Sequence, residues 1–193
     1  VTDKVHVAKY GTTITSPKLE EQKNGAVDTL VKSRIVNQDD QAHSIYAEYE
    51  IVDQNGQVVS KKVRSKVQSL LAGQEINLSH TLHVEKPTLW DVKTNNPALY
   101  TLYTRVYRDS QLVDVQKERF GYRYLNWTPE GGFFLNGVAT KFHGVSLHHD
   151  HGALGAEENY KAEYRRLKQM KDMGVNAIRT THNPASEQTL QIA

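Results

Sequence analysis

The spacing of apolar residues changes once along this chain, and that change constrains its fold more than any other feature. Up to about Tyr122, apolar and polar residues alternate in short runs that end at turn-forming residues. A period of two is typical of β-strands with one buried face. Between Glu157 and Met173, apolar residues recur every three or four positions, which indicates an amphipathic helix. The pattern predicts a β domain at residues 1–122 and a different, α/β-type segment at residues 123–193.

The first segment is predicted to contain about seven short strands, several of them joined as hairpins. His43–Val52 is one alternating run, and the Asn55-Gly56 pair that follows it is a strong signal for a tight hairpin turn. Leu99–Tyr107 and Leu112–Phe120 form a second predicted hairpin around a polar turn. About seven strands with turns at this spacing describe an immunoglobulin-like β-sandwich.

The second segment alternates strands and helices. Gly131–Gly137 is predicted to be a strand that enters an Asn-Gly turn, and Thr140–Leu147 is the predicted return strand. Val175–Thr181 is a further short strand, and Pro184 is predicted to open a second helix, where its missing N–H costs no hydrogen bond. A strand, a helix and a strand in this order indicate a βαβ unit of a parallel sheet.

The helix between these strands has its own end signals. Glu157 and Glu158 are predicted in its first turn, where the helix dipole favours acidic residues, and this explains them without a catalytic role. Gly174 is predicted to end the helix as a C-cap residue. The predicted apolar face consists of Tyr160, Tyr164, Leu167 and Met170.

Charge and cysteine content exclude several classes of function. The chain has 24 Lys and Arg against 22 Asp and Glu, a net charge of +2, so it lacks the basic field typical of nucleic-acid binding. It has no cysteine, which excludes disulfides and thiolate metal sites. No apolar run approaches the roughly 18–20 residues that a membrane span needs. No nucleic-acid partner and no membrane span are therefore predicted.

Histidines gather where two of the predicted strands end. Four of the nine histidines lie between His143 and His151, and His182 lies at the end of the next strand together with Arg179. An α/β barrel builds its active site at the carboxyl ends of its strands, so these residues are candidate functional groups. His149 and His151 resemble metal ligands, but adjacent histidines point apart and no second ligand cluster accompanies them. No metal site is predicted.

Both segments carry motifs that occur together in one enzyme family. The motifs are Phe120-Gly121-Tyr122-Arg123, Phe134-Leu135-Asn136-Gly137, His143-Gly144-Val145 with His148, and Arg179-Thr180-Thr181-His182-Asn183-Pro184. In order and spacing they resemble the family-2 glycoside hydrolases, which include bacterial β-galactosidases, β-glucuronidases and β-mannosidases. In that family an immunoglobulin-like sandwich runs directly into a (β/α)8 barrel. The resemblance implies a mainly β chain in which residues 123–193 are the truncated start of such a barrel.

The resemblance implies a retaining β-galactosidase that hydrolyses terminal non-reducing β-D-galactosides by double displacement. Retaining glycosidases use two carboxyl groups about 5–5.5 Å apart, one as acid/base and one as nucleophile. The family carries both of them on later barrel strands, beyond Ala193. The chain is therefore expected to contain no catalytic carboxylate and to be an inactive fragment by itself.

Supporting residues are implied within this chain. His148 and His182 match family histidines that hydrogen-bond sugar hydroxyls, and Arg179 matches an arginine that braces the nucleophilic carboxylate. Asp150 lies where β-glucuronidases carry an acidic residue that faces the sugar, whereas many β-galactosidases have histidine there. A loop-capping role explains Asp150 equally well.

Two alternatives to a β-galactosidase stay open. One is a β-glucuronidase of the same family, for which the acidic residue at position 150 is the relevant observation. The other is a non-catalytic immunoglobulin-like module used for adhesion or spacing. The stretch from His148 to Gly155 is similar to the large β-galactosidases of Gram-positive surfaces, which implies an extracellular or bacterial cell-surface location.

The same resemblance bears on cofactors and partners. No cofactor is predicted within the chain, and Mg²⁺ is expected only in the full-length parent, because the magnesium ligands of some family members lie downstream. The expected partner of the full-length protein is a β-galactoside oligosaccharide. A truncated barrel leaves strand edges and apolar helix faces exposed, so the isolated chain is expected to self-associate as a dimer or larger assembly.

Overall fold

A computed structural model describes residues 2–92 and 97–193, and this described part is mainly β. Residue 1 and residues 93–96 of the predicted β domain lie outside this description. The chain divides into two compact units. The first comprises Val1–Trp127 and Phe134–Val138, and the second comprises Thr128–Phe133 and Ala139–Ala193.

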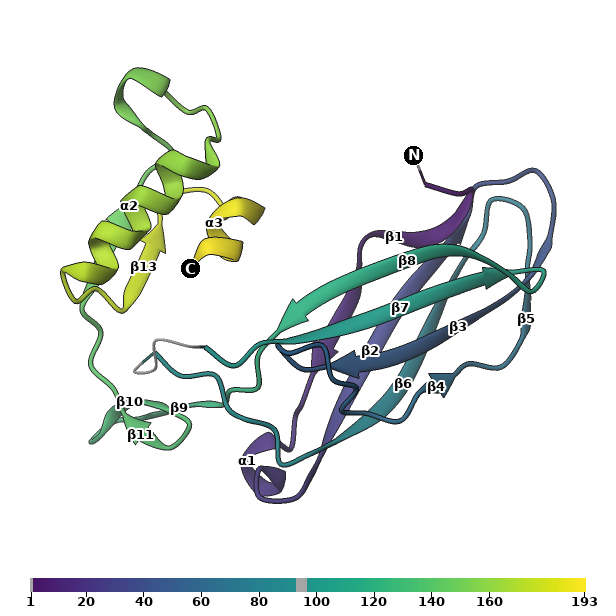
Figure 1. Ribbon diagram of the computed structural model, residues 1–193, viewed down its shortest axis with the longest axis horizontal. Helices are drawn as coiled ribbons and strands as arrows, with labels where there is room; N and C mark the ends of the chain where they lie inside the picture. Colours follow the sequence, from purple (N-terminus) through teal and green to yellow (C-terminus); the bar gives the residue numbers. More distant parts are fainter. Residues whose placement is uncertain (1, 93–96) are drawn as a thin grey trace. The chain divides into compact units, whose positions relative to one another are not determined.

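The first unit is a β-sandwich of two antiparallel sheets (Figure 1). One sheet has the strand order β1 (Val5–Thr15), β2 (Ala26–Asn37) and β6 (Glu75–Glu85). The other has the order β4 (Val63–Arg64), β3 (His43–Val52), β7 (Tyr100–Arg108) and β8 (Gln111–Phe120), and β5 (Gln68–Leu70) also pairs with β3. A short helix, α1 (Leu19–Gln22), connects β1 to β2. The predicted sandwich is confirmed.

Alternating residues of both sheets fill the space between them. Val27, Val31 and Ile35 of β2 are fully buried, as are Ile45 and Ile51 of β3. β-Branched side chains suit these positions because they pack well against neighbours on a pleated surface. Burial of one such side chain contributes about 1.5–3 kcal/mol, so this layer is what holds the two sheets together.

Both predicted hairpins are present. β7 and β8 are neighbours in the second sheet and pair antiparallel. At the other turn Gly56 has a φ of +79°, a left-handed conformation that glycine adopts without strain. Val52 and Val58 form a bridge across that turn, as the Asn-Gly signal predicts.

His43 joins two loops at one end of the second sheet. Its Nδ1 is 2.8 Å from a carboxylate oxygen of Asp109, and its Nε2 is 3.0 Å from a carboxylate oxygen of Asp39. The pKa of His43 is raised above its ordinary value of 6.5. The larger cause is its hydrogen bond with Asp39, and the second is its hydrogen bond with Asp109. Hydrogen bonds from Lys4 and His43 lower the pKa of Asp39, and the bond from His43 lowers the pKa of Asp109.

We expect His43→Gln to lower the free energy of unfolding most between about pH 4 and pH 6.5. A raised folded-state pKa makes the histidine's contribution complete below its unfolded pKa, and the contribution is lost as pH rises through the folded pKa. The lowered pKa values of Asp39 and Asp109 have the opposite pH dependence. The stabilisation from these two carboxylates is complete above pH 3.8, their ordinary pKa, and is lost as pH falls below it. The three groups therefore make their full contributions together only in this window.

Urea unfolding of the wild type and His43→Gln at about pH 5.5 and about pH 9 measures this effect. His83→Gln is the matched control, because His83 is an exposed histidine that pairs with Asp28. The control is expected to change the free energy of unfolding less at pH 5.5, since exposed ion pairs contribute little. An equal loss for His43→Gln at both pH values would contradict the interpretation.

The second unit contains a βαβ unit, as predicted. β12 (Gly144–Leu147) pairs in parallel with β13 (Ala177–Thr180), and α2 (Tyr160–Asp172) connects them. A 3₁₀ turn, η1 (Gly152–Leu154), lies between β12 and α2 in the sequence, and α3 (Glu187–Ile192) follows β13. Figure 1 shows α2 alongside β13, with α3 next to both.

The prediction that Thr140–Leu147 is a return strand is wrong. The turn at Asn136-Gly137 returns into β11 (Val138–Ala139), which forms a small sheet with β10 (Gly132–Leu135) and β9 (Leu125–Thr128). The side chain of Asn176 accounts for the departure of the chain from this small sheet after β11. It accepts a hydrogen bond from the His143 N–H at 2.8 Å and donates one to the Lys141 carbonyl at 2.9 Å. These bonds bring β12 to β13 instead of β10.

α2 begins later than predicted. Asn159 is its N-cap, with an extended backbone and a side chain that accepts the Ala162 N–H at 3.1 Å. Glu157 and Glu158 precede the helix and are not in its first turn, because asparagine is among the strongest N-cap residues. Gly174, with a φ of +88°, follows the last turn and ends the helix as predicted.

The predicted apolar face of α2 is only partly correct. Leu167 is buried, but Tyr160 and Tyr164 are about half exposed and stack on each other with ring centroids 6.3 Å apart. Glu163 takes a buried position instead. Its carboxylate can be buried because it receives hydrogen bonds from neighbouring side chains, among them Arg166.

α3 begins at Glu187, so the prediction that Pro184 opens it is wrong. Ser186 is the N-cap residue, and its hydroxyl accepts a hydrogen bond from the Thr189 N–H at 3.2 Å. Serine is a preferred N-cap residue, and this contact sets where the helix starts. Pro184 lies in the loop before it.

Candidate functional site

β12 and β13 form a two-stranded sheet with one exposed face. Paired residues of a parallel sheet point to the same side, and successive residues point to alternate sides. Ser146 and Arg179 are paired and exposed, whereas the adjacent Leu147 is buried. The same alternation places His148 and Thr181 on the side of Ser146 and Arg179. We call the surface formed by these four residues, together with the adjoining His182 whose ring lies near that of His148, the open face.

His148 follows the last residue of β12. Its Nε2 lies 3.1 Å from the hydroxyl of Thr181, which is buried and donates a hydrogen bond to the Leu147 carbonyl at 3.2 Å. Because the hydroxyl has only one proton, it accepts the hydrogen bond from the Nε2–H of His148. In the neutral ring this tautomer leaves Nδ1 as the acceptor atom.

His182 lies at the end of the neighbouring strand, after Thr181, and the peptide bond between them is cis. The rings of His148 and His182 have centroids 6.0 Å apart and planes inclined by 62°. Both residues are exposed. The structure thus brings together two of the four predicted site residues, from segments more than thirty positions apart in the sequence.

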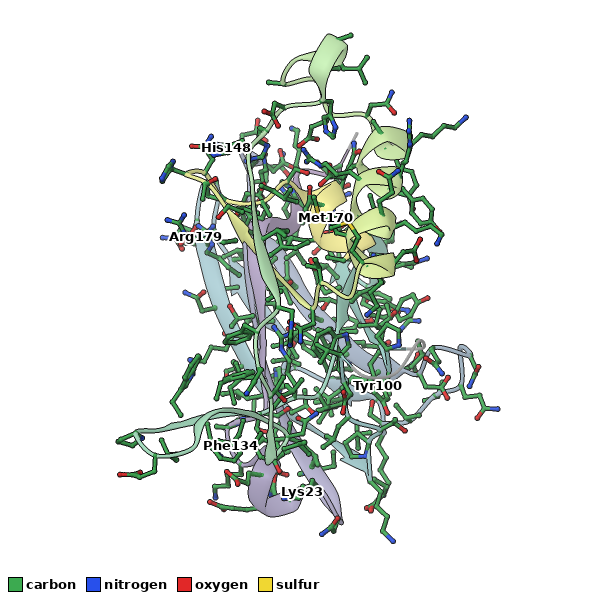
Figure 2. All side chains as sticks on the ribbon, turned by 90° about the vertical axis from the view of Figure 1, so that its left-hand side faces the viewer. Lys23, Tyr100, Phe134, His148, Met170 and Arg179 are labelled. Carbon is green, nitrogen blue, oxygen red and sulfur yellow. The ribbon has the colours of Figure 1, made fainter. Side chains whose placement is uncertain are left out.

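Arg179 lies on β13, two residues before Thr181, and belongs to the open face. Figure 2 shows it on the opposite side of the two-stranded sheet from Met170 of α2. It lines a wide depression of about 370 Å³ together with Phe142 and residues of β12 and β13. A long cationic side chain in this position can reach an anionic group placed over the sheet.

Asp150 lies in the loop after β12. Its N–H donates to the His148 carbonyl at 2.9 Å, and its own carbonyl accepts from Arg166 Nη1 at 2.7 Å. Its carboxylate is 77% exposed, with one oxygen 3.7 Å from the same Arg166 nitrogen. The backbone of Asp150 is held firmly, and the role of its carboxylate toward a sugar stays a prediction.

Two contributors to this site were missed from the sequence. Thr181 orients the His148 ring, and the repeated threonine before His182 is the signal that could have pointed to it. Arg166 holds the backbone of the loop after β12 through the carbonyls of His148 and Asp150. Nothing in the sequence marks Arg166 as a site residue, because a basic residue on a helix is normally exposed to solvent.

The open face has the chemistry of a binding surface for a polar molecule. Two imidazoles and a guanidinium can donate and accept hydrogen bonds to hydroxyl groups and can face an anion. Within residues 2–92 and 97–193 there is no group of three or more His, Asp or Glu side chains arranged to hold a metal ion. The helices of this described part include none that is both long and apolar enough to cross a membrane.

Comparisons with known proteins agree with this arrangement. Residues 5–123 match the family model for glycosyl hydrolases family 2, and residues 128–193 match the model for the TIM barrel domain of that family. A solved structure of a family 2 glycosyl hydrolase from Bacteroides cellulosilyticus matches 99% of this chain with a TM-score of 0.88 and 31% identity, and the match covers 25% of that protein.

Two curated relatives carry different activities in their names. The β-galactosidase BoGH2A of Bacteroides ovatus is 36% identical over 191 residues, which are 99% of this chain and 22% of that protein. A β-glucuronidase of Bacteroides fragilis is 32% identical over 150 residues, which are 77% of this chain and 21% of that protein. The chain thus spans about a fifth of the length of these relatives.

The two units now have a place in a larger architecture. The sandwich is the immunoglobulin-like domain, and the βαβ unit is the start of the TIM barrel. In such barrels the active site is built at the carboxyl ends of the strands, which is where His148 and His182 lie. The chain belongs to glycosyl hydrolase family 2, a family of glycosidases.

Proposed function

We propose that the full-length protein is a retaining β-galactosidase that hydrolyses terminal non-reducing β-D-galactosides by double displacement. The observation that carries the proposal is the pairing of His148 and His182 at the ends of neighbouring barrel strands, on the open face. The similarity to a β-galactosidase over nearly the whole chain supports the choice of sugar. The proposed partner is a β-galactoside oligosaccharide.

His148 and His182 are proposed to bind sugar hydroxyls. The hydrogen bond from Nε2–H to Thr181 fixes the tautomer of His148, so Nδ1 accepts a hydrogen bond from a hydroxyl of the substrate. The ring of His182, inclined to that of His148, offers a second contact from the neighbouring strand. Contacts to sugar hydroxyls that tighten in the transition state supply several kcal/mol of stabilisation in glycosidases.

Arg179 is proposed to brace the nucleophilic carboxylate. It lies on the open face, which faces the interior in a closed barrel, and a guanidinium there keeps a facing carboxylate ionised and oriented. The nucleophile and the acid/base are proposed to come from parts of the full-length protein outside residues 1–193. The chain by itself is therefore proposed to bind weakly and to catalyse nothing.

No step is assigned to a cofactor within this chain. The residues 2–92 and 97–193 offer no metal-ligand cluster, and their proposed roles are to bind and orient the sugar and to hold a carboxylate. Mg²⁺ is proposed only for the full-length protein, with ligands outside this chain. An extracellular or bacterial cell-surface location is proposed on the family resemblance alone.

The isolated chain is proposed to self-associate. β12 and β13 form a sheet of only two strands in the described part of the chain, so each has an edge whose backbone groups can pair with another strand. The apolar part of the depression over this sheet adds to the exposed surface.

A β-glucuronidase is the second candidate. Asp150 stands in the loop after β12, at the position where the family resemblance places an acidic residue that faces a glucuronide, and its carboxylate is exposed. A β-glucuronidase is also among the curated relatives. The same His148, His182 and Arg179 roles apply to either sugar.

Hydrolysis of nitrophenyl β-D-galactoside and nitrophenyl β-D-glucuronide by the full-length protein separates the two candidates. We expect kcat/KM to be at least about tenfold higher for the galactoside, since a site arranged for one sugar substituent rejects another strongly. A preference for the glucuronide would select the second candidate. Hydrolysis of neither, nor of other β-glycosides, would favour a non-catalytic module.

A further inference from the structure

Glu163 and Arg166 form an ion pair on α2 that is largely withdrawn from solvent. Arg166 Nη2 lies 2.5 Å from Glu163 Oε2, and the two side chains are 22% and 5% exposed. Removing two charges from water costs several kcal/mol, and such pairs are often no better for stability than apolar residues of similar size. The contacts that Arg166 and Glu163 make with other residues therefore indicate what role the pair has.

Arg166 is bound to the backbone of the loop that carries His148. Its Nη1 donates to the Asp150 carbonyl at 2.7 Å and to the His148 carbonyl at 3.2 Å. The guanidinium thus holds the backbone on both sides of His149. Because the donors of arginine have a fixed planar geometry, these bonds set the orientation of the loop as well as its distance from α2.

Glu163 connects this loop to the helix after β13. Its Oε1 accepts a hydrogen bond from the Thr189 hydroxyl of α3 at 2.9 Å, and its Oε2 is 3.4 Å from His151 Nε2. α3 follows the segment that carries His182. One buried carboxylate therefore contacts both the loop that follows His148 and the helix that follows the His182 segment.

We propose that Glu163 and Arg166 are positioning residues that fix His148, and through α3 the His182 segment, for binding the sugar. This inference rests on the proposed function, because it assigns a role within the same site. Both residues belong to α2, and their hydrogen bonds and ion pairs join them to the loop backbone, Asp150, His151 and Thr189. They act on the substrate only through the histidines.

Arg166→Met in the full-length protein is expected to lower kcat/KM for the hydrolysed nitrophenyl glycoside by about 10- to 100-fold, because a displaced His148 no longer meets its hydroxyl. Arg166→Lys is expected to give an intermediate value, because lysine keeps the charge but not the planar fork. Arg165→Met is the matched control, because the neighbouring Arg165 is exposed on the same helix. The control is expected to stay within about twofold of the wild type.

A double-mutant cycle separates positioning from general stability. In the His148→Ala background, Arg166→Met is expected to lower kcat/KM by less than about threefold, because the ring through which it acts is gone. A full additional loss in that background would overturn the proposal. If Arg166→Met does not fold, the double-mutant cycle is measured with Arg166→Lys and His148→Ala instead.

The result also distinguishes this proposal from the proposed function. If the wild type is active and His148→Ala is impaired while Arg166→Met and Arg166→Lys match the wild type, the positioning role is wrong and the function stands. If the wild type hydrolyses no glycoside, the NMR signals of ¹³C-labelled histidine test the position of the His148 ring without turnover. An unchanged His148 signal in Arg166→Met would then overturn the positioning role.

Discussion

Replacing His148 with alanine in the full-length protein is expected to lower kcat/KM for nitrophenyl β-D-galactoside by about 10²-fold or more. The ring is held by Thr181 in a tautomer that leaves Nδ1 as an acceptor for the proposed sugar hydroxyl, and alanine removes that acceptor. Because this proposed contact is expected to tighten in the transition state, kcat is expected to fall along with kcat/KM. Steady-state kinetics of the wild type and the variant measure both.

The matched control for this prediction is His149→Ala. His149 is adjacent in the same loop but lines a small pocket with residues of α2 and α3, so it does not belong to the open face. Its replacement is expected to leave kcat/KM within about threefold of the wild type. Normal kinetics in His148→Ala, or an equal loss in both variants, would show that the open face is not the sugar site.

Replacing Arg179 with methionine is expected to lower kcat by about 10³-fold, the second large effect. Arg179 lies on the open face, and its proposed partner is the nucleophilic carboxylate of the full-length enzyme. Without the guanidinium that carboxylate loses the charge that keeps it ionised, so its pKa rises. The acidic limb of the pH profile of kcat/KM is therefore expected to move to higher pH.

Arg179→Lys provides the comparison. Lysine retains the positive charge, so it is expected to restore the pH profile toward that of the wild type while kcat stays reduced, because it lacks the two-pronged geometry of arginine. If Arg179→Met lowers kcat without moving the acidic limb, Arg179 does not act on an ionising carboxylate. Unchanged kcat would remove it from the site altogether.

The sandwich could be predicted from the sequence because its signals are local. Alternation along β3, a glycine at a turn position with a left-handed backbone, and a second hairpin between β7 and β8 each follow from short stretches of residues. The βαβ order of the second unit also follows from periodicity. These features need no knowledge of long-range contacts.

The element boundaries that were wrong depend on single polar side chains. Asn159 and Ser186 set the starts of α2 and α3 through cap hydrogen bonds, and each competed with another plausible start nearby. Asn176 separates β12 from the small sheet before it by binding the backbone at Lys141 and His143. Which of several polar residues forms such bonds is decided by tertiary structure.

In the candidate site, too, some residues can be predicted from local motifs and others only from tertiary contacts. His148, His182 and Arg179 were placed by motif, and the structure brings the two histidine rings to the same end of the open face. The burial of Glu163 could not be predicted, because a glutamate between an alanine and a tyrosine on a helix normally faces solvent. Its role depends on partners from the loop after β12 and from α3, which no periodicity reveals.

The most direct test of the account is the initial rate of nitrophenyl β-D-galactoside hydrolysis by the full-length protein, with the isolated chain of residues 1–193 assayed beside it at equal concentration. We expect turnover by the full-length protein and none by the isolated chain, because residues 1–193 are proposed to supply sugar-binding groups and a brace but not the catalytic carboxylate pair. Failure of the full-length protein to hydrolyse any β-glycoside, or turnover by residues 1–193 alone, would contradict it.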